Sequence, residues 1–222
     1  MTKIKICGIS RVEHAHAVAE AGADFMGLVF AASKRQVSPQ TARQIITALD
    51  DYENRPETVG VFVNTPPADI NNIAAFCGLD WIQLSGHESW EYCRQIEKPA
   101  IKVIRVSNAD DTAKIISELS IGSKVLNDRS FICLLDTDIR GSYGGTGHSF
   151  DWKVAAGISE RYPVIIAGGL SPDNVEQVIN TAAPWGVDVS SGVETGDSKD
   201  ISKIQAFVRA VRRTDEEDTN TP

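Results

Sequence analysis

A cysteine near the N-terminus has the surroundings of a reactive thiol. Cys7 ends the apolar run Lys3–Cys7 (KIKIC), and strand alternation would place Lys5 on the same face as the thiol. A nearby cation favours the thiolate, which can act as a base or a nucleophile, so the pattern predicts that the pKa of Cys7 is lowered. From the residues alone, a small buried thiol is the more common outcome, and Lys5 could simply pair with a buried carboxylate.

A carboxyl group occupies the same kind of position later in the chain. Asp136 closes the run Phe131–Asp136 (FICLLD), on the face of Ile132 and Leu134. A carboxyl group at the end of such an apolar strand can have a raised pKa and act as a general acid, although a helix cap or a turn is an equal alternative. The glycine-rich stretch Gly141–Gly147 that follows suits a lid or a loop that contacts phosphate.

Two turns rich in glycine and serine predict an anion site. They are AGGLSPDN (Ala167–Asn174) and DVSSGVE (Asp188–Glu194). Glycines let backbone N–H groups approach a phosphate closely, and serine hydroxyls add donors. Either turn alone is a weak signal, but two of them after neighbouring strands make a stronger one. The candidate phosphate ligands are Gly168, Gly169, Ser190, Ser191 and Gly192.

Four more polar residues stand where they could reach the same site. Arg35, in the basic stretch 31–36 (AASKRQ), has the forked geometry that binds a carboxylate, although a solvated surface arginine is the common alternative. Gln83 shares a strand face with Trp81, which would fill the interior. Asp188 and Arg105 are candidates for polar contacts within the site, and structural pairing is at least as plausible for both.

Eight short β-branched runs, each followed by a helix-like stretch, must position these groups. Their starts lie roughly 26 residues apart on average, about the length of one strand–helix unit. This repetition predicts an α/β fold with a single closed (β/α)8 TIM barrel over residues 1–213, whose active site would lie at the C-terminal ends of the strands. The runs are Lys3–Cys7, Phe25–Phe30, Thr58–Val63, Asp80–Leu84, Ala100–Val106, Phe131–Asp136, Val164–Ala167 and Gly186–Ser190.

Short sequence motifs predict where three of the helices begin, and composition predicts a disordered C-terminal tail. Ser38-Pro39, Thr65-Pro66 and Ser171-Pro172 each place a capping hydroxyl before a proline that suits the first helical position. Residues 214–222 contain four acidic residues and no basic one, which predicts a solvated, disordered tail.

Composition narrows the class of protein. The 22 basic and 30 acidic residues give a net charge of −8, which argues against a general binder of nucleic acid or of anionic membranes. No apolar run approaches the roughly 20 residues of a membrane span, and the N-terminus lacks the apolar core of a secretory signal. The cysteines show no metal-binding spacing, so we expect free thiols and a cytoplasmic location; they are Cys7, Cys77, Cys93 and Cys133.

Taken together and in order, the motifs resemble those of the phosphoribosylanthranilate isomerase family. The resemblance runs from about residue 3 to residue 208. GGTG or AGGL alone would not be specific, but the combination is. The matching segments are KICGIS (5–10), GADFMGLVFAASKRQVS (22–38), VGVFVN (59–64), DWIQLSGHE (80–88), LLDT (134–137), GGTGHSFDW (144–152), AGGLSPDNV (167–175) and GVDVSSGVETGDSKD (186–200).

The resemblance implies a (β/α)8 barrel enzyme of tryptophan biosynthesis that catalyses an Amadori rearrangement of N-(5-phosphoribosyl)anthranilate. It makes Cys7 the expected general base, Asp136 the expected general acid and Arg35 the contact for the anthranilate carboxylate. The glycines and serines above would surround the phosphate. No metal or redox cofactor is implied, because the imine intermediate is itself the electron sink. The implied partner is a small phosphorylated substrate, and the enzyme would be a monomer or a homodimer.

The sequence departs from the family pattern twice, and two other functions remain open. Ser85 stands where the family has a histidine, for which His87 could substitute, and Lys34 replaces a loop proline. Another sugar-phosphate isomerase, of the histidine pathway or with dual substrates, would fit the phosphate turns. A barrel that binds a phosphorylated metabolite without catalysis would also fit, although binding alone requires neither Cys7 nor Asp136.

Overall fold

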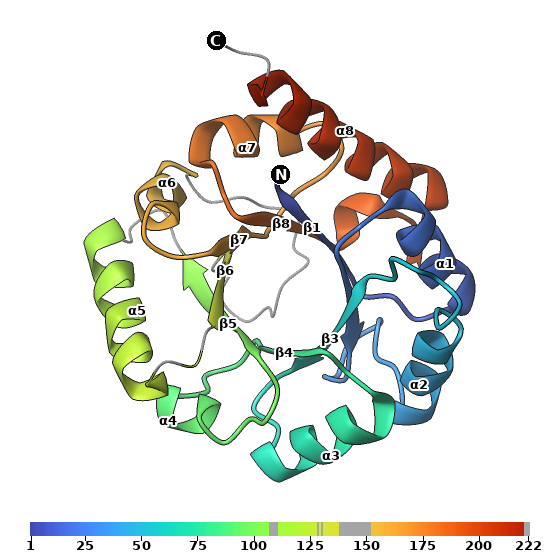
Figure 1. Cartoon of the computed structure of the whole chain (residues 1–222), viewed down its shortest axis with the longest axis horizontal. Coiled ribbons are helices and arrows are strands. Elements are labelled where there is room, and N and C mark those ends of the chain that lie inside the picture. The colour runs from blue at the N-terminus through green and yellow to red at the C-terminus, as the bar shows by residue number, and fades with distance from the viewer. Residues whose placement is uncertain (107–110, 128, 130, 138–151, 220–222) are drawn as a thin grey trace.

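The computed structural model describes residues 1–106, 111–127, 129, 131–137 and 152–219. Their parallel strands form a closed barrel in which the spatial order follows the sequence order and β8 pairs with β1 (Figure 1). The predicted (β/α)8 barrel is therefore confirmed. The barrel strands are β1 (Lys3–Cys7), β2 (Phe25–Val29), β3 (Glu57–Phe62), β4 (Trp81–Leu84), β5 (Ala100–Val106), β6 (Phe131–Thr137), β7 (Val164–Ile166) and β8 (Gly186–Val189).

Helices surround the barrel, as Figure 1 shows. They are α1 (Val12–Ala21), α2 (Pro39–Thr47), α3 (Pro67–Cys77), α4 (Trp90–Cys93), α5 (Thr112–Leu126), α6 (Lys153–Ser159), α7 (Val175–Ala182) and α8 (Ile201–Thr219). Between β8 and α8 lie a 3-10 turn, η1 (Ser191–Val193), and a small hairpin of β9 (Glu194–Thr195) and β10 (Ser198–Lys199). No helix among the described residues is long and apolar enough to cross a membrane.

Strand alternation divides the core into two layers. Ile4 and Ile6 of β1 belong to the larger cluster between the strands and the helices. The barrel interior holds a separate apolar cluster, against which Trp81 and Trp185 pack at the N-terminal ends of β4 and β8. Because bulky side chains fill the interior, the barrel is a packed core rather than a pore, and a ligand must bind at the other end.

One of the three predicted helix starts is confirmed and two differ. Ser38 caps α2, and its hydroxyl accepts a hydrogen bond from the Thr41 N–H at 3.1 Å. Helix α3 begins only at Pro67, because a residue that precedes a proline disfavours the helical conformation and Pro66 is extended. Helix α7 begins at Val175 rather than at Pro172, after a turn closed by the side chain of Asn174.

The C-terminal residues are more ordered than their charge suggests. Helix α8 continues to Thr219, so residues 214–219, where the composition suggested a disordered tail, are drawn into the last helix. The Asp215 carboxylate accepts hydrogen bonds from the Thr2 N–H at 2.9 Å and from the Thr2 hydroxyl at 2.7 Å. Arg212 also donates to the Thr2 carbonyl oxygen, at 2.7 Å. Acidic composition alone cannot reveal a partner more than 200 residues away.

Candidate active site

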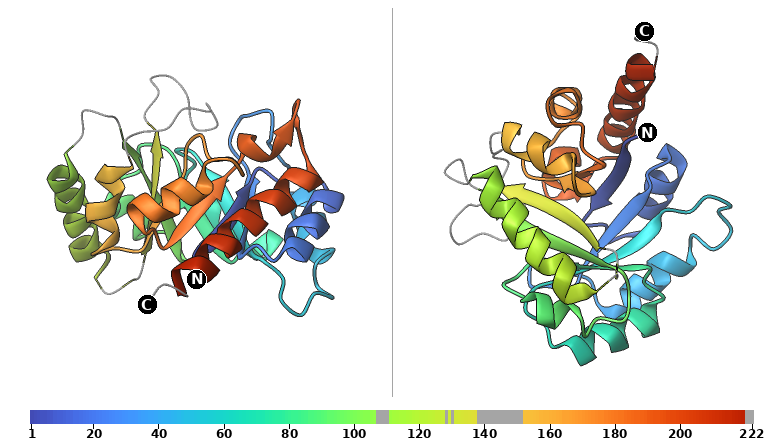
Figure 2. Two further views of the ribbon diagram at one scale, coloured as in Figure 1. Left: turned by 90° about the horizontal axis from the view of Figure 1, so that it is seen from above. Right: turned by 60° about the vertical axis from the view of Figure 1, so that its left-hand side comes forward.

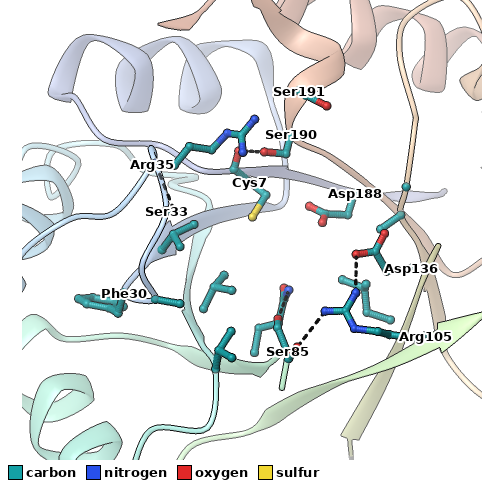
Figure 3. Close-up of a pocket in the computed structure, with 18 of the residues that line it drawn as sticks. Cys7, Phe30, Ser33, Arg35, Ser85, Arg105, Asp136, Asp188, Ser190 and Ser191 are labelled. Carbon is teal, nitrogen blue, oxygen red and sulfur yellow. Dashed lines mark hydrogen bonds and ion pairs between the residues drawn. The ribbon is translucent and has the colours of Figure 1, made fainter. Parts of the chain in front are cut away.

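A cavity of about 470 Å³ opens at the C-terminal ends of the barrel strands (Figure 3). Its walls come from strands and loops around most of the barrel. The structure therefore brings together residues that are far apart in the sequence, as the barrel rule predicts. Among its lining residues are nine of the ten predicted site residues: Cys7, Arg35, Gln83, Asp136, Gly168, Gly169, Asp188, Ser190 and Ser191.

Cys7 and Asp136 lie on different walls of this cavity. Cys7 is the last residue of β1, and its sulfur points into the cavity (Figure 3). Asp136 lies near the end of β6, which β7 and β8 separate from β1. A carboxylate oxygen of Asp136 is 3.9 Å from Arg105, whose guanidinium also donates to the Ser85 carbonyl oxygen at 3.0 Å. An acid and a base could thus act on different atoms of one ligand.

Beneath Cys7 lies a buried ion pair. Lys5 is fully buried, and its ammonium donates to the Asp188 carboxylate at 2.9 Å. The two residues are neighbours in the register of β1 and β8. Burial alone would lower the pKa of Lys5, but Asp188 and Cys7 outweigh this effect and the pKa is raised. Lys5 therefore stays protonated and is largely neutralised by Asp188.

This pairing changes the expectation for the thiol. Burial raises the pKa of Cys7, and Lys5 opposes this only in part, because Asp188 stands beside it with the opposite charge. The structure therefore contradicts the predicted lowering of the Cys7 pKa. A raised pKa favours the protonated thiol over the thiolate.

Alkylation should report this directly. Because only the thiolate reacts, the rate of Cys7 modification by iodoacetamide should rise with pH, with a midpoint above the value of about 8.5 for an ordinary thiol. Modified peptides identified by mass spectrometry would give the rate at each pH. The Cys7→Ser variant is the control for reaction at other cysteines. A plateau reached below pH 7 would contradict the assignment.

The two turns in which we predicted a phosphate site both reach the cavity, although Gly192 does not line it. Gly168 and Gly169 have φ angles of +88° and +70°, which favour glycine. The Ser190 hydroxyl donates to the Cys7 carbonyl oxygen at 3.2 Å, which ties the end of β8 to the end of β1. Gly192 is not among the lining residues; a Cβ there would lie 1.8 Å from the Leu170 carbonyl oxygen, so this glycine lets the two turns touch.

Arg35 is held by a partner that the sequence did not single out. Its Nε and Nη2 donate to the two carboxylate oxygens of Glu194 at 2.7 and 2.8 Å, and Lys199 donates to the same carboxylate at 2.7 Å. Burial alone would raise the pKa of Glu194, but these two cations lower it to about 2. No local pattern could reveal a pair separated by 159 residues.

The two departures from the family pattern have structural counterparts. Lys34 forms an ion pair with Asp197 of the hairpin turn; both side chains are exposed, so the pair contributes little stability. Ser85 lines the cavity and accepts a hydrogen bond from Gln83 Nε2 at 3.1 Å. His87 is not a lining residue, so its side chain does not take the place of Ser85 in the cavity.

The remaining walls suit an aromatic ligand that carries hydrogen-bond donors. The Gln83 side-chain oxygen is buried and has no hydrogen-bond partner among the described residues, so it can accept a bond from a ligand. Phe30 lines the cavity and stacks on Phe62 with ring centroids 4.9 Å apart. Further apolar contacts come from Val61, Val63, Leu134 and Leu170. The predicted lid, Gly141–Gly147, lies outside the described residues.

The fold and the cavity define a (β/α)8 barrel enzyme whose site brings together a thiol, carboxyl groups, two arginines and glycine-containing turns. A family model described as N-(5'-phosphoribosyl)anthranilate (PRA) isomerase matches residues 4–210, and the chain belongs to this family.

Individual relatives agree along nearly the whole chain. The N-(5'-phosphoribosyl)anthranilate isomerase of Dehalococcoides mccartyi is 46% identical over 215 residues, which cover 97% of this chain and 98% of the relative. The enzyme of the same name from Desulforudis audaxviator is 44% identical, with 96% and 98% covered. The crystal structure of phosphoribosyl anthranilate isomerase from Thermotoga maritima superposes with a TM-score of 0.82 at 36% identity, covering 96% of this chain and all of that one.

A second solved structure includes a ligand. It is a phosphoribosyl anthranilate isomerase in complex with reduced 1-(o-carboxyphenylamino)-1-deoxyribulose 5-phosphate. It is 35% identical to this chain and superposes with a TM-score of 0.79, covering 96% of this chain and all of that one.

Proposed function

We propose that the chain converts N-(5-phosphoribosyl)anthranilate into 1-(2-carboxyphenylamino)-1-deoxyribulose 5-phosphate, a step of tryptophan biosynthesis. The observation that carries this proposal is the presence of Cys7 and Asp136 on different walls of one cavity, in a chain of this family. The ligand of the solved relative carries a carboxyphenyl group and a phosphate. Arg35 and the turns after β7 and β8 offer groups for these two anions.

The reaction requires one acid and one base. Asp136 protonates the ring oxygen of the ribose, the bond from C1 to that oxygen breaks, and the opened sugar is a protonated Schiff base. This cation acidifies the hydrogen on C2, which Cys7 removes to give an enolamine. The enolamine then tautomerises to the ketone: C1 gains a proton, the C2 hydroxyl loses one, and the double bond moves from C1–C2 to C2–O. Asp136 loses one proton and Cys7 gains one, so the net charge of the pair is unchanged.

The substrate would span the cavity with an anion at each end. Its phosphate would bind at the glycine–serine turns, with Gly168 and Gly169 on one side and Ser190, Ser191 and the backbone of Gly192 on the other. Its carboxylate would bind the edge of Arg35 that Glu194 does not occupy.

The middle of the substrate would then face polar side chains. The Gln83 oxygen and the Asp188 carboxylate both line this part of the cavity and can accept hydrogen bonds from sugar hydroxyls or from the amine.

The activity can be tested by following the loss of phosphoribosylanthranilate fluorescence with purified protein. The proposal predicts turnover without added metal or redox cofactor. If the protein turned over other phosphorylated aminosugars but not phosphoribosylanthranilate, the result would favour a different sugar-phosphate isomerase activity. Tight binding of phosphoribosylanthranilate without turnover would favour a barrel that binds a metabolite but does not catalyse.

Replacing Arg35 by alanine should weaken substrate binding more than it slows turnover. A hydrogen bond to a charged group contributes about 1.5–3 kcal/mol, so KM should rise about tenfold or more while kcat changes little. Steady-state kinetics from the fluorescence assay would measure both. Arg43→Ala is the matched control, because Arg43 lies on α2 over the ring of Phe76 and away from the cavity. An unchanged KM in Arg35→Ala would remove Arg35 from the site.

Two further proposals concern the state of the protein in the cell. The four cysteines are all free and buried, which supports a reducing compartment such as the cytoplasm. A solved Thermotoga maritima structure is described as monomers of a dimeric phosphoribosylanthranilate isomerase, so this chain could be a monomer or a homodimer. Light scattering of the purified chain would distinguish these states.

A further inference from the structure

A buried group of three charged side chains joins two loops at the mouth of the barrel. Arg35 comes from the loop after β2, and Glu194 and Lys199 come from the two strands of the β9–β10 hairpin. The side chains of Glu194 and Lys199 are 5% and 2% exposed, and that of Arg35 is 15% exposed. Burying three charges is costly unless each is well paired, so the arrangement calls for a functional explanation.

Glu194 holds Arg35 by one edge. Both hydrogen bonds come from the Nε and Nη2 side of the guanidinium, which fixes the plane of the group. The aliphatic part of Arg35 packs against Gly8, where a Cβ would lie 2.5 Å from Arg35 Cδ. Nη1 makes no hydrogen bond to a described residue, so it can donate to a ligand together with the second hydrogen of Nη2.

The same carboxylate also holds Lys199, which supports the other anion site. The Lys199 ammonium donates to Glu194 and to the Ser190 carbonyl oxygen, both at 2.7 Å, and lies 3.4 Å from the Ser190 hydroxyl. Ser190 begins the turn at which we place the phosphate. Glu194 therefore contacts one cation that faces the carboxylate site and another that fixes the phosphate turn.

We propose that Glu194 is a positioning residue that orients Arg35 and Lys199 together, and thereby sets the spacing between the two anion-binding ends of the substrate site. This inference rests on the proposed function, because it assumes a substrate with a carboxylate at one end and a phosphate at the other. Glu194 itself does not line the cavity and need not touch the substrate.

A second explanation, in which Glu194 serves only as a counter-charge for the two cations, predicts the opposite change in anion affinity. If Glu194 only neutralised the two cations, Glu194→Gln would leave the site more positive and anions would bind more tightly. If Glu194 positions them, the same change releases both side chains and anions bind more weakly, although the site is more positive. The direction of the change in affinity thus separates the two explanations.

The experiment combines substrate kinetics with two small competitive inhibitors, anthranilate for the carboxylate end and inorganic phosphate for the other end. For Glu194→Gln, KM should rise about tenfold with kcat within about threefold, and both inhibition constants should rise. Arg35→Lys should raise only the constant for anthranilate, and Lys199→Gln only that for phosphate. Glu194→Asp keeps the charge and should recover part of the lost affinity.

The controls keep the result interpretable. Glu176→Gln removes the carboxylate of an exposed ion pair with Arg213, between α7 and α8, and should change neither KM nor the inhibition constants. An unchanged or lower KM in Glu194→Gln would overturn the inference, as would a fall in kcat alone. If Glu194→Gln does not fold, Glu194→Asp decides: its shorter carboxylate keeps the charge and should still raise both inhibition constants, whereas unchanged constants would contradict the inference. An inactive wild-type protein would instead overturn the proposed function.

Discussion

Cys7→Ser should lower kcat for phosphoribosylanthranilate by at least about 100-fold, the usual contribution of a general base. Serine has nearly the same shape as cysteine, so the barrel and the cavity should be preserved. Its hydroxyl is a far weaker acid than a thiol and supplies almost no anion near neutral pH. Because the loss falls on proton abstraction rather than on binding, KM should change little. The fluorescence assay gives both constants.

The matched control for this variant is Cys77→Ser. Cys77 is also buried, but it ends α3 and its thiol donates to the Pro39 carbonyl oxygen, away from the cavity. Its kcat should equal that of the wild type. Near-native turnover in Cys7→Ser would show that some other group removes the proton from C2.

The raised pKa of Cys7 adds a requirement to this mechanism. In the form that reacts, Asp136 is protonated and Cys7 is a thiolate. Ordinary groups behave in the opposite way, because near neutral pH a carboxyl group is ionised and a thiol is protonated. The cation formed on ring opening attracts a nearby thiolate and so favours ionisation of Cys7 at the moment when the base is needed. Activation of Cys7 would then come from the bound substrate rather than from Lys5, whose charge Asp188 balances.

Asp136→Asn should also lower kcat by at least about 100-fold, because an amide cannot deliver the proton that opens the ribose ring. The replacement is close in shape, and Arg105 can still contact the amide oxygen, so the end of β6 should keep its geometry. Ring opening would become rate-limiting. A single-turnover experiment should therefore show slow loss of substrate fluorescence without a burst.

Asp197→Asn is the control for the general loss of a carboxylate at the barrel mouth. Asp197 is exposed in the hairpin turn and pairs only with Lys34 among the described residues, so kcat should stay within about twofold of the wild type. If Asp136→Asn retained most of its activity, the carboxyl would not be the acid and ring opening would have to be assisted elsewhere in the cavity.

The fold was predictable because its signals are local and repeated. Alternation within Lys3–Cys7 correctly predicted that Lys5 lies on the same face as Cys7, while Ile4 and Ile6 pack on the other face, against the helices. Once the number of strands is known, the barrel rule places every strand end at one mouth. This rule explains why most of the predicted site residues line a single cavity.

The errors arose where distant residues decide the outcome. The pKa of Cys7 depends on the burial of its site and on Asp188, which lies 181 residues further along the chain. The hydrogen bonds between Arg35 and Glu194 likewise cannot be predicted from the sequence around either residue. The C-terminal helix is joined by Asp215 to Thr2, a partner 213 residues earlier in the chain. Contacts between residues so far apart in the sequence form only in the folded barrel, so the sequence around each residue does not predict them.

The contact between Thr2 and Asp215 also fixes where attachments to this protein would sit. Thr2 precedes the start of β1, so the two bonded ends lie at the base of the barrel, on the side away from the loops that surround the cavity (Figure 2). A second domain attached ahead of Thr2 would therefore project from that base. A tether of this kind would leave the entrance open to substrate, and a neighbouring enzyme could be linked here without obstructing it.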